Sequence, residues 1–194
     1  MKDYFKIKHN QAAPAKGKIL IAEPFLRDVY FQRSVVLLVS HNKLGSMGFV
    51  LNHRMLLHVN DFFEELKDVP KIPVYLGGPV ASNRLFFIHS LDSLTENSEQ
   101  ITDNLYLDGD LEKLMYHLRS GKPLNDRVKF FIGYSGWSEN QLSREINENS
   151  WLIGEASDAR ILHSEDESFW TECVQNIGGE YLTWLNYPKD PTLN

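Results

Sequence analysis

The feature that most constrains the fold is an uninterrupted apolar run, Val35–Val39, between Ser34 and Ser40. A strand that alternates polar and apolar residues can leave one face in water, but a run without polar positions has two apolar faces. Its valines favour a strand over a helix. The run therefore predicts a strand in the interior of a sheet, covered on both sides. A chain of 194 residues can bury roughly 70% of its unfolded surface, which is enough for one such domain.

Further strands are expected where short apolar or alternating segments end at glycine, proline or polar turns. They cover residues 18–22, 49–51, 74–76, 85–89, 101–107, 128–134, 151–153 and 182–185. Four helices are expected between them, and they do not alternate strictly with the strands. This order favours a mixed-sheet α+β domain over a doubly wound sheet. We expect residues 17–194 to form that single domain after an N-terminal arm of residues 1–16.

Polar side chains that can accept hydrogen bonds from free N–H groups mark the expected helix starts, and glycines mark the ends. The expected starts are Asn60, either Asp108 or Asp110, a capping box at Ser138–Gln141 and a second box at Ser164–Glu167, and the expected ends include Gly121 and Gly178.

The charge distribution bears on possible partners. The formal net charge is −6, and no run of Lys or Arg occurs. This composition disfavours non-specific nucleic-acid binding, and no helix pair carries a basic recognition helix. Residues 1–91 hold 12 basic and 7 acidic groups, whereas residues 92–194 hold 8 and 19. The two halves either interleave, so that the difference averages out, or form a dipolar surface for a charged partner.

Several function classes lack their motifs. The sequence contains no GxGxxG, no GxxxxGK[ST] and no HExxH, so no cofactor or metal site is expected. Cys173 is the single cysteine and is either a buried inert thiol or a reactive one. The N-terminus has no apolar signal region and no apolar run is long enough to span a bilayer. We expect a cytoplasmic protein that does not contact membranes.

Three titratable residues lie close to the buried run. Asp28 and Arg33 precede it, and they either form the lip of a pocket or pair with each other. His41 follows it, and a histidine at a strand end either serves as a general base or bonds a nearby turn.

Three other segments could carry chemistry. Gly77-Gly78-Pro79 could present free N–H groups to an anion, or reverse the chain sharply. Ser135, in Gly-Tyr-Ser-Gly-Trp, resembles half of a nucleophile elbow, but Trp137 stands where the second glycine belongs. The alternative is a tight turn before a helix start that could bind an anion. Gln141, Glu145 and Asn149 share one helix face that is either solvated or lines a pocket.

Residues 17–52, 75–90 and 130–152 together closely resemble the AlgH/YqgE-like bacterial family, and the resemblance extends over residues 17–187. It implies a bifurcated mixed sheet that forms a flattened barrel-like core with about four helices outside. It also implies a bacterial cytosolic protein that carries the label of a transcriptional regulator but has no established activity. The family offers no catalytic residues to transfer. Family members often have alanine at the position of Ser135, which argues against a nucleophile there.

Three functions remain open. The first is a non-catalytic regulatory protein that binds a small anionic ligand or a protein partner. The second is a hydrolase or transferase that uses His41 or His89 as a base. The third is direct DNA binding, which requires a shared face for Lys16, Lys18, Arg27, Lys43, Arg54, Lys71 and Arg84. For the first, the expected pocket residues are Asp28, Arg33, Ser34, His41, Gly77, Gly78, Pro79, Ser135, Trp137, Gln141 and Glu145.

Overall fold

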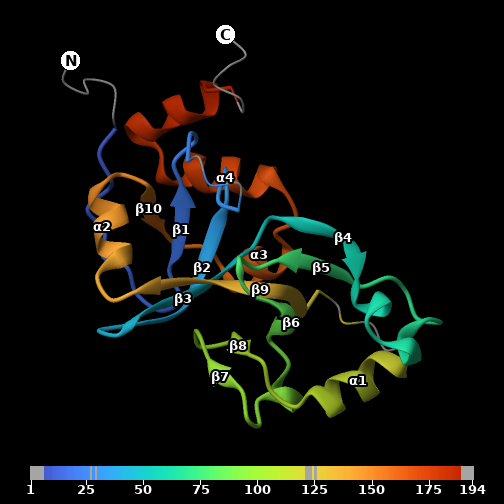
Figure 1. Ribbon diagram of the computed structural model, residues 1–194. Helices are drawn as coiled ribbons and strands as arrows, with labels where there is room; N and C mark the ends of the chain where they lie inside the picture. The colour runs from blue at the N-terminus through green and yellow to red at the C-terminus, as the bar shows by residue number, and fades with distance from the viewer. Residues whose placement is uncertain (1–6, 27, 29, 121–123, 125, 189–194) are drawn as a thin grey trace.

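The computed structural model describes residues 7–26, 28, 30–120, 124 and 126–188, and it contains a ten-stranded sheet (Figure 1). Eight strands follow the order β10-β1-β2-β3-β9-β6-β8-β7, while β4 pairs with β5 and β5 pairs with β9. The strands are β1 (Ile19–Ala22), β2 (Val35–Asn42), β3 (Gly45–Val50), β4 (Arg54–His58), β5 (Pro73–Leu76), β6 (Val80–His89), β7 (Glu99–Gln100), β8 (Tyr106–Leu107), β9 (Val128–Ser138) and β10 (Trp151–Gly154).

The long strand β9 divides the sheet into two branches. Its residues 130–132 pair in parallel with β5, and its residues 135–138 pair antiparallel with β3. Strand β6 pairs antiparallel with β9 on the other edge. The predicted mixed α+β fold with a bifurcated sheet is therefore confirmed, and the sheet stays open. The two halves of the chain interleave, because β9 and β10 pair with strands of the first half.

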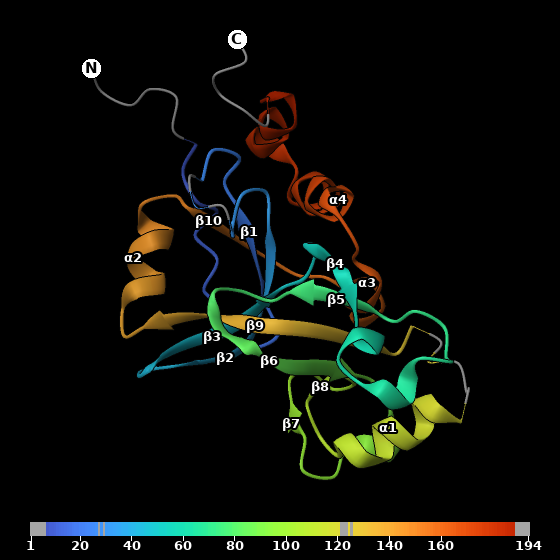
Figure 2. The same cartoon turned by 45° about the vertical axis from the view of Figure 1, so that its right-hand side comes forward.

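Helices and 3₁₀ turns surround the sheet. Helices α1 and α2 lie at opposite ends of the molecule, and α4 lies beyond β1 and β2 (Figures 1 and 2). The helices are α1 (Leu111–Arg119), α2 (Gln141–Asn147), α3 (Asp158–His163) and α4 (Glu167–Ile177), and the 3₁₀ turns are η1 (Val59–Asp61), η2 (Glu64–Leu66), η3 (Asp92–Leu94) and η4 (Gly179–Asn186).

Both faces of β2 are buried, as the apolar run predicts. Alternate residues such as Leu37 belong to a core that includes Phe169 and Trp170 of α4. The residues between them, such as Leu38, belong to a second core with Leu142 of α2. Each fully buried aliphatic side chain of this kind contributes about 1.5–3 kcal/mol. A third core joins α1 to β5, β6 and β9.

The expected strand over residues 101–107 is wrong. The N–H groups of Ile101 and Thr102 both donate to the carbonyl oxygen of Leu105, and the Thr102 hydroxyl accepts from the Leu105 N–H. These bonds close a turn, so only Tyr106 and Leu107 pair in this segment. Local side-chain bonding to the backbone outweighs the alternating pattern.

Two expected capping boxes are also wrong. Ser138 ends β9, and the residue before α2 is Asn140; Gln141 Oε1 accepts from the Ser138 N–H, so half of the box forms. Ser164 follows α3, a helix that the pattern did not predict, and Asp166 caps α4 instead. Asp110 caps α1 as expected.

Two further expectations fail at the edges of the fold. Asn60 lies inside η1 rather than before it, with its Nδ2 donating to Leu66 O at 2.7 Å and its Oδ1 accepting from Ile72 N–H at 2.9 Å. This buried amide therefore satisfies backbone groups of the loop that follows it and fixes the conformation of that loop. Residues 182–185 belong to η4 rather than to an edge strand. Gly178 follows α4 as expected, and Gly121 lies outside the described residues.

Candidate functional site

The expected pocket residues occupy separate places in the fold. Arg33 precedes β2 and His41 lies near its other end. Eight strand residues span roughly 26 Å at about 3.3 Å per residue. The structure therefore does not bring Arg33 and His41 into one pocket, and each group is described where it lies.

Arg33 ties the start of β2 to the C-terminal part of the chain. Its side chain is 12% exposed, and Nη1 donates to Glu167 Oε1 at 2.6 Å. Nη2 donates to the Tyr187 carbonyl, and the guanidinium lies 5.0 Å from the Trp170 ring. Asp28 accepts from the Tyr30 N–H, and no Arg33–Asp28 ion pair is present among the described residues. The expected pocket lip stays a prediction, because residues 27 and 29 beside Asp28 lie outside the described residues.

Ser34 lies next to Arg33 and is fully buried, with no hydrogen-bond partner for its hydroxyl among the described residues. Asn52 bridges this corner: its Oδ1 accepts from the Val35 N–H, and its Nδ2 donates to the Arg33 carbonyl. The contacts around Arg33 and Ser34 thus hold the strand entry in place.

Glu145 of α2 accepts three hydrogen bonds. The donors are Trp137 Nε1 at 2.8 Å, Trp151 Nε1 at 2.9 Å and Gln141 Nε2 at 2.9 Å. Trp137 is only 5% exposed, so it packs in the core instead of covering a ligand. The polar face of α2 therefore contacts the tryptophans of β9 and β10.

The glycine pair is a place of close backbone approach. The Gly77 N–H donates to Ile132 O, and its carbonyl accepts from Val50 N–H and from the Ser135 hydroxyl. A Cβ at Gly77 or at Gly78 would lie 2.3–2.4 Å from backbone atoms of β9. The Gly77 N–H is thus not free for an anion.

Pro79 follows this pair and leads the chain into β6, which favours the interpretation of Gly77-Gly78-Pro79 as a chain reversal. Ser135 is fully buried, with no access for a substrate.

The two candidate histidines differ in access. His89 is 0% exposed; its Nδ1 accepts from Leu91 N–H and its Nε2 donates to Asp108 O. Burial lowers the pKa of His89, which therefore has a structural role. His41 Nδ1 lies 2.7 Å from Ser46 Oγ, and both residues line a cavity of about 320 Å³.

Cys173 is also inaccessible. It lies on the buried face of α4, and burial raises the pKa of its thiol to about 12. A thiol with so little thiolate is not a nucleophile at neutral pH.

A larger cavity, of about 490 Å³, is lined by residues of β5, the start of β9, α3 and the end of α1. Most of its lining is apolar, and a few charged groups converge on it. It is lined by Val69, Pro70, Lys71, Ile72, Pro73, Tyr75, Leu118, Leu124, Asp126, Val128, Lys129, Leu162, His163 and Glu165. We call it the Lys129 cavity.

Lys129 is the unusual group in this lining, because it is only 3% exposed. Its Nζ donates to the carbonyl and to the hydroxyl of Ser164, the latter at 3.0 Å, and lies 3.6 Å from the centre of the Tyr75 ring. Burial lowers the pKa of Lys129 from 10.5 to about 7. Burial also raises the pKa of the Tyr75 phenol to about 12.

Sequence reasoning missed this site. The signal was a lysine between Val128 and Phe130, in a segment over residues 128–132 that is otherwise apolar. A charged residue there must be exposed at an edge or buried with partners. Its role depends on β5 pairing in parallel with β9, which places Tyr75 opposite Phe131. That long-range pairing is not visible in local patterns.

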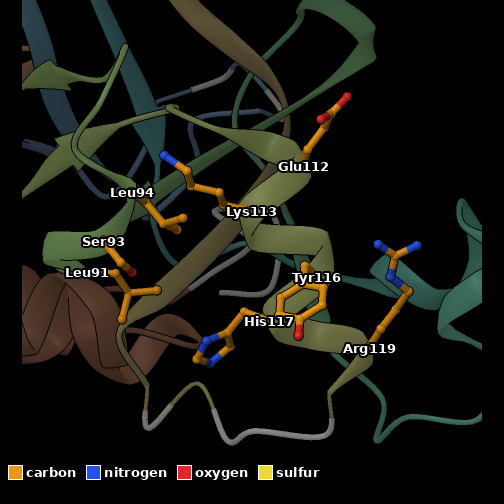
Figure 3. A pocket seen from close by; sticks show the side chains of 8 residues that line it. All are labelled: Leu91, Ser93, Leu94, Glu112, Lys113, Tyr116, His117 and Arg119. Atoms are coloured by element: carbon orange, nitrogen blue, oxygen red, sulfur yellow. The ribbon is translucent and has the colours of Figure 1, made fainter.

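A third hollow runs along α1 and has a volume of about 480 Å³. Figure 3 shows Lys113, Tyr116, His117 and Arg119 projecting from α1, with His117 on the side of Leu91 and Arg119 on the side away from it. Lys113 is paired with Glu96 and Asp110, and Arg119 is paired with Glu65. These charges are already matched at the surface, so the hollow is a weaker candidate than the Lys129 cavity.

The described ranges of the chain contain no cluster of three or more His, Cys, Asp or Glu side chains placed to hold a metal ion. None of their helices combines the length and apolarity needed to cross a bilayer.

Comparison with known proteins places the chain among proteins of similar sequence. A family model described as AlgH-like matches residues 19–182. A UPF0301 protein of Parabacteroides distasonis is 53% identical over 194 residues, which covers 100% of this chain and 98% of the relative. A UPF0301 protein of Bacteroides thetaiotaomicron is 41% identical, with 99% of this chain and 97% of the relative covered.

Solved structures show the same arrangement. The solution structure of the AlgH protein from Pseudomonas aeruginosa matches with a TM-score of 0.70 and 28% identity, covering 92% of this chain and 97% of that one. A crystal structure of a protein from Corynebacterium diphtheriae matches with a TM-score of 0.73 and 22% identity, covering 92% and 94%. The second likeness concerns the fold alone.

Proposed function

The chain belongs to the AlgH-like family, and from that premise we propose that it is a non-catalytic regulatory protein that binds a small ligand in the Lys129 cavity. The cavity volume of about 490 Å³ lies within the 300–1,000 Å³ typical of small-molecule sites. Apolar walls with a few convergent polar groups are also typical of such sites.

The observation that carries this proposal is the nearly complete burial of a lysine in the cavity lining. Folding must take its side chain out of water, which costs free energy unless partners compensate. Ionisable groups whose pKa is shifted by burial are concentrated at functional sites. Lys129 bonds Ser164, and His163 and Glu165 are engaged in ion pairs with other side chains. Side chains that are fixed by hydrogen bonds and ion pairs suit the positioning of a ligand better than the making of a covalent bond.

The test is thermal unfolding against a panel of nucleotides, organic acids, amines and sugars. A ligand at about a hundredfold its Kd should stabilise the protein by about 2.7 kcal/mol. Leu162→Trp fills the Lys129 cavity and should abolish the effect. Leu56→Trp, at a position that is 98% exposed, is the matched control and should leave it intact.

Two outcomes contradict the proposal. If the stabilisation persists in Leu162→Trp, the ligand binds elsewhere. If no compound stabilises the protein, a protein partner is favoured over a small ligand.

One contact favours a second function, acyl transfer at the end of β2. Ser46 Oγ lies 2.7 Å from His41 Nδ1 in a cavity that Lys43 and Ser143 also line. A hydroxyl and a histidine in such contact can act as nucleophile and base. We would measure hydrolysis of an activated ester by the wild type and by Ser46→Ala. Equal rates would exclude this function.

Direct DNA binding receives less support. Five of the seven cations named for it contact carboxylates within the protein. Arg27 lies outside the described residues. Cations that are already paired contribute less to a phosphate-binding surface.

A further inference from the structure

Lys129 is buried without an anionic partner. Within the described part of the chain, no carboxylate lies within 4.0 Å of its Nζ, and its partners are the neutral Ser164 and the face of Tyr75. Buried charges in proteins are normally paired, because an unpaired charge in an apolar region is costly. Lys129 therefore has an unmatched positive charge whenever it is protonated.

Other charged groups at this cavity lie beside groups that can match them. Glu165 faces Arg54 at 3.4 Å, and Asp126 lies 3.3 Å from His163 Nε2, which carries a charge only when protonated. Lys71 faces Asp61 at 3.7 Å. Glu165 is close enough to raise the pKa of Lys129, but burial has the larger and opposite effect. An arriving anion would therefore supply the counter-ion that Lys129 lacks among the described residues.

The rest of the lining determines what the anion is attached to. Val69, Ile72, Leu118, Leu124, Val128 and Leu162 form the apolar part of the wall. A sugar or a nucleotide would bury hydroxyl groups against these side chains without hydrogen-bond partners. An alkyl or aromatic body would instead gain from burial of apolar area.

We infer that the ligand of the Lys129 cavity is an amphipathic monocarboxylate, with its carboxylate on the Lys129 ammonium and its apolar body against the aliphatic wall. This inference rests on the proposed function, because it names the ligand class of the same cavity. A charge-assisted hydrogen bond between ammonium and carboxylate is about twice as strong as a neutral one. The contact also supplies the counter-ion that Lys129 lacks.

The experiment is calorimetric titration of the full chain with four probes. Octanoate has both the carboxylate head and the alkyl body. Octanol and octylamine keep the alkyl body without the carboxylate, and acetate keeps the carboxylate without the long alkyl body. We expect octanoate to bind at least about tenfold more tightly than each of the other three. Octanol binding as tightly as octanoate would overturn the inference, since the head group would then go unrecognised.

Variants locate the carboxylate. Lys129→Met should remove the preference for octanoate over octanol, while Lys67→Met, at an exposed lysine outside the cavity lining, should leave it within about twofold. If Lys129→Met does not fold, the pH dependence of wild-type binding replaces it. Carboxylate binding favours the ammonium, so octanoate affinity should fall about tenfold per pH unit above 7. Affinity that is flat over this range would contradict a role for Lys129.

The failures of the two proposals are distinguishable. If a nucleotide or a sugar stabilises the protein and Leu162→Trp abolishes the effect, the cavity is a ligand site but the carboxylate inference is wrong. If octanoate binds with the same affinity to Leu162→Trp, both are wrong for this cavity.

Discussion

Glu145 holds together two tryptophans and a glutamine at the junction of α2, β9 and β10. Hydrogen bonds to a charged acceptor contribute about 1.5–3 kcal/mol each, and a buried indole N–H without a partner is costly. Glu145→Ala should therefore lower the free energy of unfolding by about 3–5 kcal/mol, measured by urea denaturation. The exposed Glu139→Ala is the control. An equal effect of both variants would show that Glu145 has no special role.

Lys129 makes stability depend on pH. The folded protein binds its proton less tightly than the unfolded chain, because burial lowers the pKa from 10.5 to about 7. Between these values the unfolded chain carries more protons, so stability should rise with pH by up to about 1.4 kcal/mol per unit. Below pH 7 the contribution is constant and unfavourable.

Lys129→Met isolates this effect. The difference in unfolding free energy between wild type and variant should change from pH 7 to pH 10 in favour of the wild type. Urea denaturation at several pH values measures it, with Lys71→Met as the exposed comparison. A difference that does not vary with pH would mean that Lys129 keeps an ordinary pKa in the folded protein.

At the scale of elements, the crossing of the Gly77–Gly78 segment over β9 requires glycine. Gly78 has φ +153°, and its Cβ would lie 2.4 Å from Tyr134 backbone atoms. Gly78→Ala should destabilise the protein by about 3 kcal/mol or more. Gly179→Ala is the matched control: its φ is +59° but no neighbour lies within 4 Å. It should cost about 1–2 kcal/mol. Similar melting temperatures for the two variants would contradict the close approach.

How far the sequence predicts an element depends on whether its cause is local. Burial of β2 follows from consecutive residues, and Asp110 caps α1 through a bond three residues away. Ser164 has the same local sequence pattern as a capping residue. It is instead buried, and it forms hydrogen bonds with Leu51 and Lys129, which are distant in the sequence. The Lys129 cavity depends on such distant pairings throughout. For this reason the sequence pattern does not predict the Lys129 cavity.

At the scale of the whole molecule, residues near the N-terminus cover the edge of β10. Asn10 Nδ2 donates to the Ile153 carbonyl at 2.6 Å, and Asn10 Oδ1 accepts from the Ile153 N–H at 3.2 Å. His9 N–H donates to Asn149 Oδ1, and the Tyr181 hydroxyl donates to Lys8 O. A covered edge strand is protected from pairing with another chain.

Asn10→Ala should expose that edge. Two hydrogen bonds are lost, which predicts a loss of about 1–2 kcal/mol and faster exchange of the Ile153 amide. Hydrogen–deuterium exchange measures it, with the exposed Gln11→Ala as control. Unchanged exchange at Ile153 would show that the arm is not required there. The division into an arm and a single domain stays a prediction, tested by whether residues 17–194 fold alone.

Lys129 is a buried amine without a carboxylate partner among the described residues, and it lines the cavity that we propose as a ligand site. The most direct test is an NMR pH titration of the Lys129 side-chain carbon next to its amine, with and without octanoate. We predict a midpoint near pH 7 in the free protein and a higher midpoint with octanoate, because the carboxylate stabilises the ammonium. A midpoint near 10.5 that octanoate does not move would contradict the account.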